Sequence, residues 1–406
     1  GRLRVFYGER LVADLSMDFL HEGLPRRHLQ AVWTPPTVTE PDRPEPADLG
    51  AVLLQMLAHP NIRSRADILH RYDHEVQGGT AVKPLVGRDP LGPGDAAVLI
   101  PQPLVEASLP GPSSWPGVAL AVGINPRYGL IDPYAMAWAC VDEAFRNAVA
   151  VGADPDRVAL LDNFCWGNPN LPDRLGSLVR CAQGCHDAAL AYEAPFISGK
   201  DSLNNEYTDA SGRRLAIPGT LLISALGIVP DGRQMATTDL KAPGDVLYLL
   251  GETRAELGGS VYDDLHGLTG ASVPQPYAQP LARLRSLHRA LRSGLVRACH
   301  DLSEGGLAVA LAEMVIGGGL GVTVDLAAVP TAEPLTLSQL LFAESLGRFL
   351  IEVAPEHTAA FETMLAGQPL GRIGVVTAVP RLTIRDGAGR VCLDLTLADL
   401  TRAFAG

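Results

Sequence analysis

The chain has 406 residues, 47% of them hydrophobic and 19% charged, which is enough for two or three domains with separate cores. A formal net charge of −12 argues against a nucleic-acid partner, because neutralising a phosphate backbone needs a basic face. The sequence contains no apolar run of about 18 residues, which argues against a membrane span. The six cysteines follow no regular framework, so we expect reduced thiols and a cytoplasmic chain.

Residues 1–74 are predicted to be a linker and an N-terminal extension from a preceding domain. The chain begins at Gly1 within a short strand, residues 3–7, so we expect a piece of something longer. The run at residues 34–46 is too rich in Pro for a helix or a central strand, which predicts a linker. Two short helices are then predicted, at residues 47–57 and 64–72.

Residues 75–235 are predicted to form an α/β or α+β domain, because apolar strands alternate with helices. Strands are predicted at residues 96–100, 118–122, 158–161 and 221–229. Strong helical periodicity predicts helices at residues 134–151 and 175–192.

A second domain of α+β type is predicted for residues 236–406. It follows a turn signal at residues 241–245. A strand is predicted at residues 246–251, helices at residues 276–293 and 305–316, and strands at residues 348–353 and 381–385. We find neither short repeats nor a low-complexity tail.

Three residues have the oxygen atoms that a hard cation prefers. Glu143 and Asn147 are four residues apart on a predicted helix, so they project from one face. Asp95 precedes a predicted strand and is a third oxygen ligand for Mg²⁺. On spacing alone, a polar pair on an exposed helix face is the simpler interpretation, because such pairs are common.

The run at residues 300–306 directly precedes a predicted helix. Asp301 or Ser303 would cap that helix, and free N–H groups beside two glycines would bind phosphate. Without further context, a plain N-cap is the preferred interpretation of these residues, because Ser and Asp are common caps.

A polar segment at residues 198–202 has the composition of a phosphate-binding turn. Gly199 would let a ligand approach the backbone, Lys200 would neutralise a phosphate, and Ser202 would donate to an oxyanion. A polar β-turn with a solvated lysine is an equally good interpretation.

Taken in order and spacing, seven segments resemble phosphoribosylformylglycinamidine synthase, a purine-biosynthetic ligase, in the second half of its synthetase portion. They are residues 72–80, 123–129, 161–169, 197–206, 256–260, 300–306 and 344–349. The resemblance implies α/β and α+β domains that form a two-domain half of an aminoimidazole-ribonucleotide-synthetase-like (PurM-like) ATP-binding architecture. It also implies that the first domain pairs with its counterpart in an N-terminal synthetase half.

The implied activity is an ATP-dependent amidoligase reaction. Such enzymes phosphorylate the amide oxygen of formylglycinamide ribonucleotide with ATP, and ammonia from a glutaminase domain or subunit then displaces phosphate. The family's catalytic residues belong to the N-terminal half, so this chain alone is expected to lack a complete active site.

The resemblance places Asp162 and Gly199 at the ATP and Ser202 at the substrate. Lys200 stands where many relatives have a Mg²⁺-binding Asn. Because an ammonium group cannot ligate a metal, Lys200 is expected to contact phosphate instead. Some long forms of the family have the same Gly-Lys-Asp-Ser sequence, so this difference does not imply inactivity.

The resemblance also implies a second, auxiliary nucleotide site. Its Mg²⁺ ligands would be Asp95, Glu143, Asn147 and Asp301, and Ser303 would contact the nucleotide. In this context, the cation interpretation of the helical pair becomes the preferred one.

Three interpretations stay open. The chain is either part of the ligase or a non-catalytic scaffold subunit that binds ADP with Mg²⁺. A third interpretation is another ATP enzyme of the same superfamily, although those enzymes lack the signature at residues 162–169.

Overall fold

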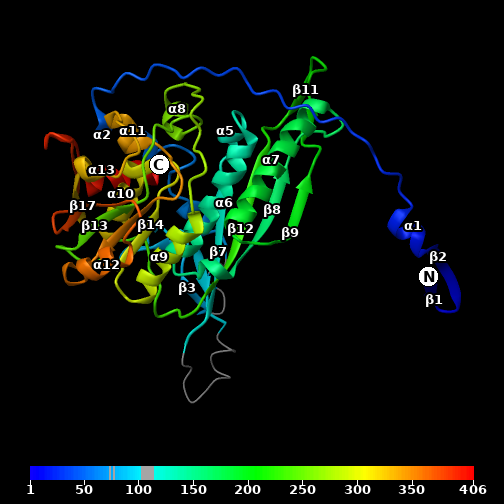
Figure 1. The fold of residues 1–406 in the computed structure, drawn as a ribbon, viewed down its shortest axis with the longest axis horizontal. Helices are drawn as coiled ribbons and strands as arrows, with labels where there is room; N and C mark the ends of the chain where they lie inside the picture. The colour runs from blue at the N-terminus through cyan, green and yellow to red at the C-terminus, as the bar shows by residue number, and fades with distance from the viewer. Residues whose placement is uncertain (73–74, 76–77, 102–113) are drawn as a thin grey trace.

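The computed structural model describes residues 1–72, 75, 78–101 and 114–406. Two sheets organise this part of the chain, and the polypeptide passes from the first to the second between β12 and β13 (Figure 1). The first sheet has the order β3 (Thr80–Val82), β6 (Ala97–Leu99), β7 (Gly117–Ile124), β12 (Thr220–Val229), β8 (Val158–Cys165), β9 (Phe196–Ser202). The second has the order β14 (Ala298–Asp301), β16 (Phe349–Val353), β13 (Val246–Leu250), β17 (Leu370–Thr377), β15 (Gly321–Asp325), β18 (Arg381–Arg385), β19 (Val391–Thr396).

The remaining strands form three small two-stranded sheets. These are β1 (Arg2–Tyr7) with β2 (Arg10–Ser16), β4 (Leu85–Val86) with β5 (Gly92–Pro93), and β10 (Glu206–Thr208) with β11 (Arg214–Ala216). The helices are α1 (Met17–Glu22), α2 (Leu49–Leu57), α3 (Ala66–Leu69), α5 (Pro126–Gly129), α6 (Pro133–Ala150), α7 (Pro172–Ala191), α8 (Val261–Leu265), α9 (Pro280–Arg292), α10 (Gly306–Gly318), α11 (Leu337–Phe342), α12 (Thr358–Met364) and α13 (Leu397–Ala405).

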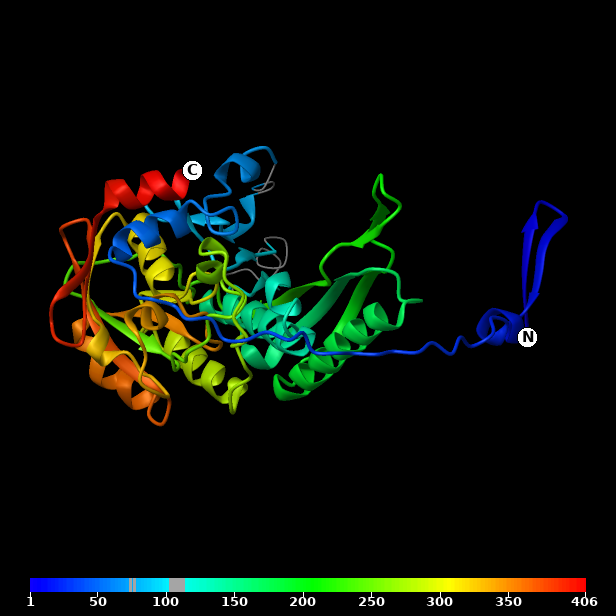
Figure 2. The ribbon, with the colours of Figure 1, turned by 90° about the horizontal axis from the view of Figure 1, so that it is seen from above.

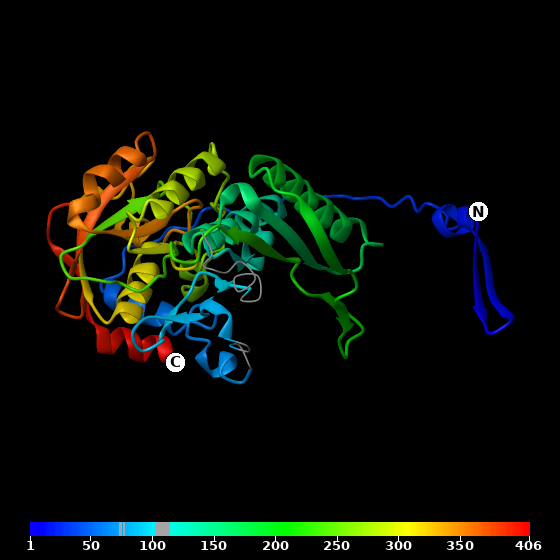
Figure 3. The same ribbon diagram turned by 90° about the horizontal axis from the view of Figure 1, so that it is seen from below.

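Helices α6 and α7 cover one face of the first sheet (Figure 3). Small residues let α6 lie directly on the sheet: a Cβ at Gly123 would come within 2.1 Å of the Cys140 carbonyl oxygen. Side chains alternate along a strand, so the other face of β7 presents Leu120, Val122 and Ile124, each more than a third exposed. The described chain therefore covers this sheet on one face only.

The second sheet is covered on both faces, and every residue of β13 is buried. Tyr248 packs on Phe361 of α12, with ring centroids 5.0 Å apart. Leu247 and Leu249 point the other way and belong to the core around α10. Continuous apolar sequence in β13 follows from this two-sided burial.

The two domains share part of their core. One cluster of buried side chains runs from Phe145 on α6 to Leu284 on α9, and α6 also contacts β14. Helix α6 is therefore one of the elements through which the first domain meets the second, and β5 also contacts α10.

The predicted helices at residues 134–151 and 175–192 correspond to α6 and α7, and the strand predicted at residues 381–385 is β18. The prediction of a polar turn at residues 198–202 is wrong. These residues continue β9, because the parallel strand β8 supplies backbone hydrogen-bond partners as far as Ser202. An exposed edge strand tolerates such polar residues. Among the described residues, we find no helix with both the length and the apolar character needed to cross a bilayer.

Candidate functional site

A cavity of about 370 Å³ lies where α6 and β7 of the first domain meet β14 and α10 of the second. Its volume is within the usual range of small-molecule sites. Its lining residues are Asn61, Ile62, Arg65, Pro93, Gly94, Asp95, Val122, Asn147, His300, Asp301, Ser303, Glu304, Ala310 and Glu313. Four of the residues predicted for the auxiliary site are therefore at one cavity: Asp95, Asn147, Asp301 and Ser303.

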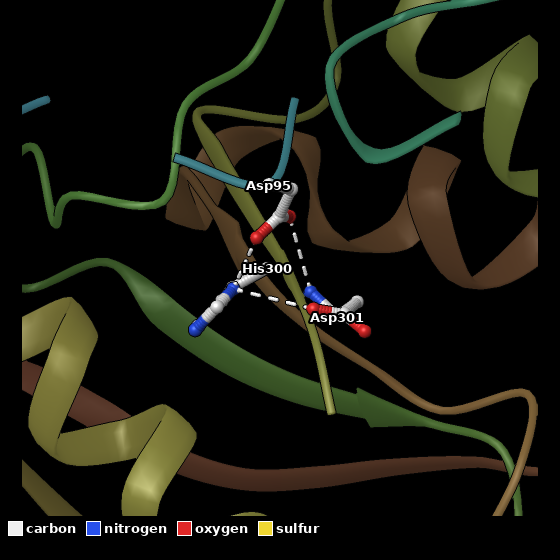
Figure 4. A group of neighbouring side chains, drawn as sticks. All are labelled: Asp95, His300 and Asp301. Atoms are coloured by element: carbon white, nitrogen blue, oxygen red, sulfur yellow. Dashed lines mark hydrogen bonds and ion pairs between the residues drawn. The ribbon is translucent and has the colours of Figure 1, made fainter. Parts of the chain in front are cut away.

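Asp95, His300 and Asp301 form the group at the wall of this cavity (Figure 4). His300 Nδ1 lies 2.6 Å from Asp95 Oδ1, and the Asp301 backbone N–H donates to Asp95 Oδ2 at 3.2 Å. One ligand atom from each of the three residues lies within 4.8 Å of the others. This spacing is compatible with a single metal ion.

His300 lies between two carboxylates, since its Nε2 is 3.0 Å from Glu313 Oε2. Burial alone would lower the His300 pKa, but Asp95 and Glu313 outweigh burial and hold it well above its usual range. Burial also raises the pKa of Asp95, to about 6, against the opposing effect of His300. Asp95 and Glu313 thus favour the protonated form of His300.

Arg146 of α6 reaches across the domain junction. Its Nη2 donates to Asp301 Oδ2 at 3.1 Å and to Ser303 Oγ at 2.7 Å, and the Ser303 hydroxyl donates to Asp301. The prediction that Asp301 or Ser303 caps α10 is wrong. The capping position is Gly305, in the left-handed region at φ 82°, because both candidate side chains are bound to Arg146 or to each other.

Glu143 and Asn147 are directed onto β7. Glu143 Oε2 accepts from the Ile124 N–H at 2.9 Å, and Asn147 Nδ2 donates to the Val122 carbonyl at 2.9 Å. The interpretation as an exposed polar pair is therefore wrong, and Asn147 is 8% exposed. Of these two residues, only Asn147 lines the large cavity.

Glu143 instead lines an adjoining cavity of about 10 Å³, and Ser303 and Glu304 line both cavities. Burial raises the Glu143 pKa well above its usual range, and Asp301 adds to this effect. Burial and Glu344 raise the Glu304 pKa to about 8. These buried carboxyl groups therefore favour their protonated form, and a bound cation would instead stabilise their charged form.

The second predicted group lies on β8 and β9. Parallel pairing sets Asp162 opposite Gly199, where a Cβ would be 2.4 Å from Asp162 Oδ1. Because side chains alternate, Lys200 and Ser202 point to the opposite face of the sheet from Asp162. Ser202 Oγ donates to Asn205 Oδ1 at 3.1 Å. None of the four predicted residues lines the large cavity.

The sequence reasoning assigned no role to several charged residues of the site, among them His300, Glu304 and Arg146. His300 directly precedes Asp301, and Glu304 directly follows Ser303. This adjacency to predicted site residues was the sequence signal that could have identified them. An arginine inside an Ala-rich helix was the signal for Arg146. Their partners come from distant segments, which no local pattern shows.

Two family models match the chain. The model described as "AIR synthase related protein, N-terminal domain" matches residues 94–229, and "AIR synthase related protein, C-terminal domain" matches residues 242–387. They correspond to the domains built on the first and second sheets.

Curated relatives match nearly the whole chain. Phosphoribosylformylglycinamidine synthase subunit PurL of Deinococcus radiodurans is 37% identical over 417 residues, covering 99% of this chain and 52% of the relative. The same subunit of Thermoplasma acidophilum is 31% identical over 404 residues, covering 99% of this chain and 50% of the relative. The chain spans about half the length of these relatives.

Solved structures show the same fold. T. maritima PurL complexed with FGAR superposes with a TM-score of 0.65 at 18% identity, covering 88% of this chain and 54% of that one. Hydrogenase maturation protein HypE in complex with ATP superposes with a TM-score of 0.53 at 18% identity, covering 72% of this chain and 88% of that one. The chain therefore has the two-domain PurM-like fold.

Proposed function

We propose that this chain, which contains both AIR synthase related domains and is homologous to about half of a PurL subunit, forms part of a phosphoribosylformylglycinamidine synthase. The observation that carries the proposal is homology over 99% of the chain. The whole enzyme would convert formylglycinamide ribonucleotide, ATP and glutamine-derived ammonia to formylglycinamidine ribonucleotide, ADP and phosphate. We place it in the cytoplasm.

In this reaction the γ-phosphoryl group of ATP passes to the amide oxygen, ADP leaves, and ammonia then displaces phosphate at the same carbon. Asp162 and Gly199 are proposed to contact the ATP that reacts, with Lys200 at a phosphate and Ser202 at the substrate. Gly199, Lys200 and Ser202 lie on the exposed edge strand β9, next to Asp162 on β8, and this position supports a site that a second half completes. The catalytic residues are expected in that N-terminal half.

The cavity at the domain junction is proposed to bind a second nucleotide with Mg²⁺. Carboxylate and amide oxygens suit Mg²⁺, and the oxygens of Asp95, Asp301 and Asn147 fit that preference. An imidazole is a poor Mg²⁺ ligand, so His300 would orient Asp95 through its hydrogen bond. Ser303 would contact the nucleotide. When bound, Mg²⁺ would neutralise phosphate charge.

The open face of the first sheet supports pairing with an N-terminal synthetase half. Leu99 on β6 and Leu120 and Val122 on the neighbouring strand β7 are 40%, 44% and 49% exposed. Contiguous exposed apolar side chains of this kind mark protein interfaces. A glutaminase domain or subunit would supply ammonia as a further partner.

Calorimetric titration with ADP, with and without Mg²⁺, tests the junction site. We expect Mg²⁺-dependent binding by the chain, and at least a tenfold weaker affinity in Asp95→Asn. Asp156→Asn, an exposed carboxylate at the domain surface, is the matched control and should bind as the parent does. Mg²⁺-independent binding, or equal affinity in all three proteins, would contradict this assignment.

A non-catalytic scaffold that binds ADP and Mg²⁺ is the second candidate, because the junction cavity is formed by this chain's own residues. An ammonia-dependent assay with formylglycinamide ribonucleotide and ATP separates the two. The chain should be inactive alone and active once joined to the N-terminal half of the D. radiodurans relative. If the folded, joined protein binds nucleotide but releases no phosphate, the scaffold interpretation holds.

A further inference from the structure

The first 22 residues stand apart from the body of the chain (Figures 1 and 2). Strands β1 and β2 form a hairpin, and α1 follows directly; we call residues 2–22 the N-terminal unit. Its apolar side chains are exposed, Leu3 by 45% and Leu20 by 41%. A two-stranded hairpin alone is marginally stable in water, so this unit needs a surface to pack on.

The other end of the chain has the same architecture. Strands β18 and β19 form a hairpin and α13 follows directly; we call residues 381–402 the C-terminal unit. Arg2 lies opposite Ser16 in the first hairpin, and Arg381 lies opposite Thr396 in the second. In both hairpins the register shifts between the fourth and fifth residues of the first strand.

Side-chain contacts repeat as well. Arg2 donates through Nε to Asp14, and Arg381 donates through Nε to Asp394. In both units the hydroxyl residue that ends the second strand caps the following helix. The sequence shows no short repeat here, and the similarity of the two units is structural. Between equivalent paired positions the second hairpin is one residue longer than the first, and few side chains are identical, so the repeat becomes visible only through the register.

The C-terminal unit shows what such a unit packs against. Leu382 and Leu400 are completely buried, whereas their counterparts Leu3 and Leu20 are exposed. Strand β18 pairs in parallel with β15, and α13 packs on α2 and α10. The N-terminal unit has the same apolar face, and the described chain does not cover it.

We propose that residues 2–22 are the closing unit of another domain of the AIR synthase C-terminal type. They dock by adding β1, in parallel, to the strand of that domain that corresponds to β15. This chain's own second domain does not accept them, because β18 already pairs with β15. The occupant is the corresponding domain of the N-terminal synthetase half; only this identity rests on the proposed function.

A graft tests whether the two units are equivalent. In the grafted chain, residues 2–22 plus one added turn residue replace residues 381–402, and the original N-terminal unit is removed. We expect a cooperative fold in which hydrogen exchange protects the β1 amides that do not bond to β2. In the parent chain the same amides exchange freely. No nucleotide is involved, so failure of the ligase proposal would leave this result unchanged.

Three variants of the graft make the test decisive. Ala13→Leu fills the position of the buried Leu393 and should raise the unfolding midpoint. Val5→Asp on the apolar face should abolish protection of β1, whereas Arg4→Ser on the opposite face should preserve it. The proposal would be overturned if the β1 amides were unprotected from exchange in the Ala13→Leu graft. It would also be overturned if they stayed protected in the Val5→Asp graft.

Discussion

The backbone N–H of Gly347 donates to Asp142 Oδ2 at 3.0 Å, which joins a loop of the second domain to the middle of α6. The same carboxylate accepts from the hydroxyls of Tyr277, at 3.1 Å, and Tyr192, and forms an ion pair with Arg146. Asp142 is completely buried. It is therefore the central acceptor of a polar network that fixes how the two domains meet beside the cavity.

Replacing Asp142 by Asn should destabilise the chain by about 3–5 kcal/mol, because the buried Arg146 loses one of its two carboxylate partners and keeps only Asp301. Urea unfolding followed by circular dichroism measures the change. The control Asp156→Asn removes an exposed carboxylate and should cost less than about 1 kcal/mol. Equal losses in both variants would show that the network contributes no special stability.

Arg146→Met should also lower the free energy of unfolding by about 3–5 kcal/mol, because the buried carboxylates of Asp142 and Asp301 both lose their ion pair with Arg146. The double variant with Asp142→Asn should lose less than the sum of the single losses, because the two changes remove the same pair. Arg285→Met, at an exposed pair, is the matched control. Strictly additive losses would contradict direct coupling.

Gly347→Ala separates steric clash from backbone strain. Gly347 has φ +68°, and a Cβ there would come within 2.2 Å of the Tyr277 ring. Gly367 has φ +84° with no neighbouring atom within 4 Å. We expect Gly367→Ala to cost about 1 kcal/mol from strain alone, and Gly347→Ala to cost at least about 2 kcal/mol more through overpacking. Comparable unfolding midpoints for the two variants would refute this.

Glu304 makes the stability of the chain depend on pH. Its pKa is about 8 in the fold because of burial, against an ordinary value of 4.5, so the folded state binds more protons between these values. Stability should therefore fall, by about 1–3 kcal/mol, as pH rises from 5 to 8. Glu304→Gln should reduce this slope without removing it, because burial also raises the pKa of Asp95 and Glu143, and Glu9→Gln at the exposed hairpin should leave the slope unchanged. Parallel pH profiles of parent and Glu304→Gln would contradict the assignment.

Local pattern was sufficient for elements whose environment is regular along the chain. The periodicity of α6 and α7 reflects one face packed on a sheet, and the apolar run of β13 reflects burial on both faces. Ordered motifs were sufficient for the relation to the synthase, since they survive in sequence whatever their contacts are. The sequence by itself determined these features.

Tertiary structure alone decided the chemistry of the junction. Asp95 and His300 are 205 residues apart in sequence and 2.6 Å apart in space. Glu143 and Asn147 form hydrogen bonds with the backbone of β7 and do not face solvent. Arg146 donates to Asp301 and Ser303, the two side chains that local rules assigned to a helix cap. Strand pairing likewise made residues 198–202 an edge strand. Spacing reports only neighbours along the chain, whereas hydrogen-bond partners and burial depend on which distant segments the fold brings together.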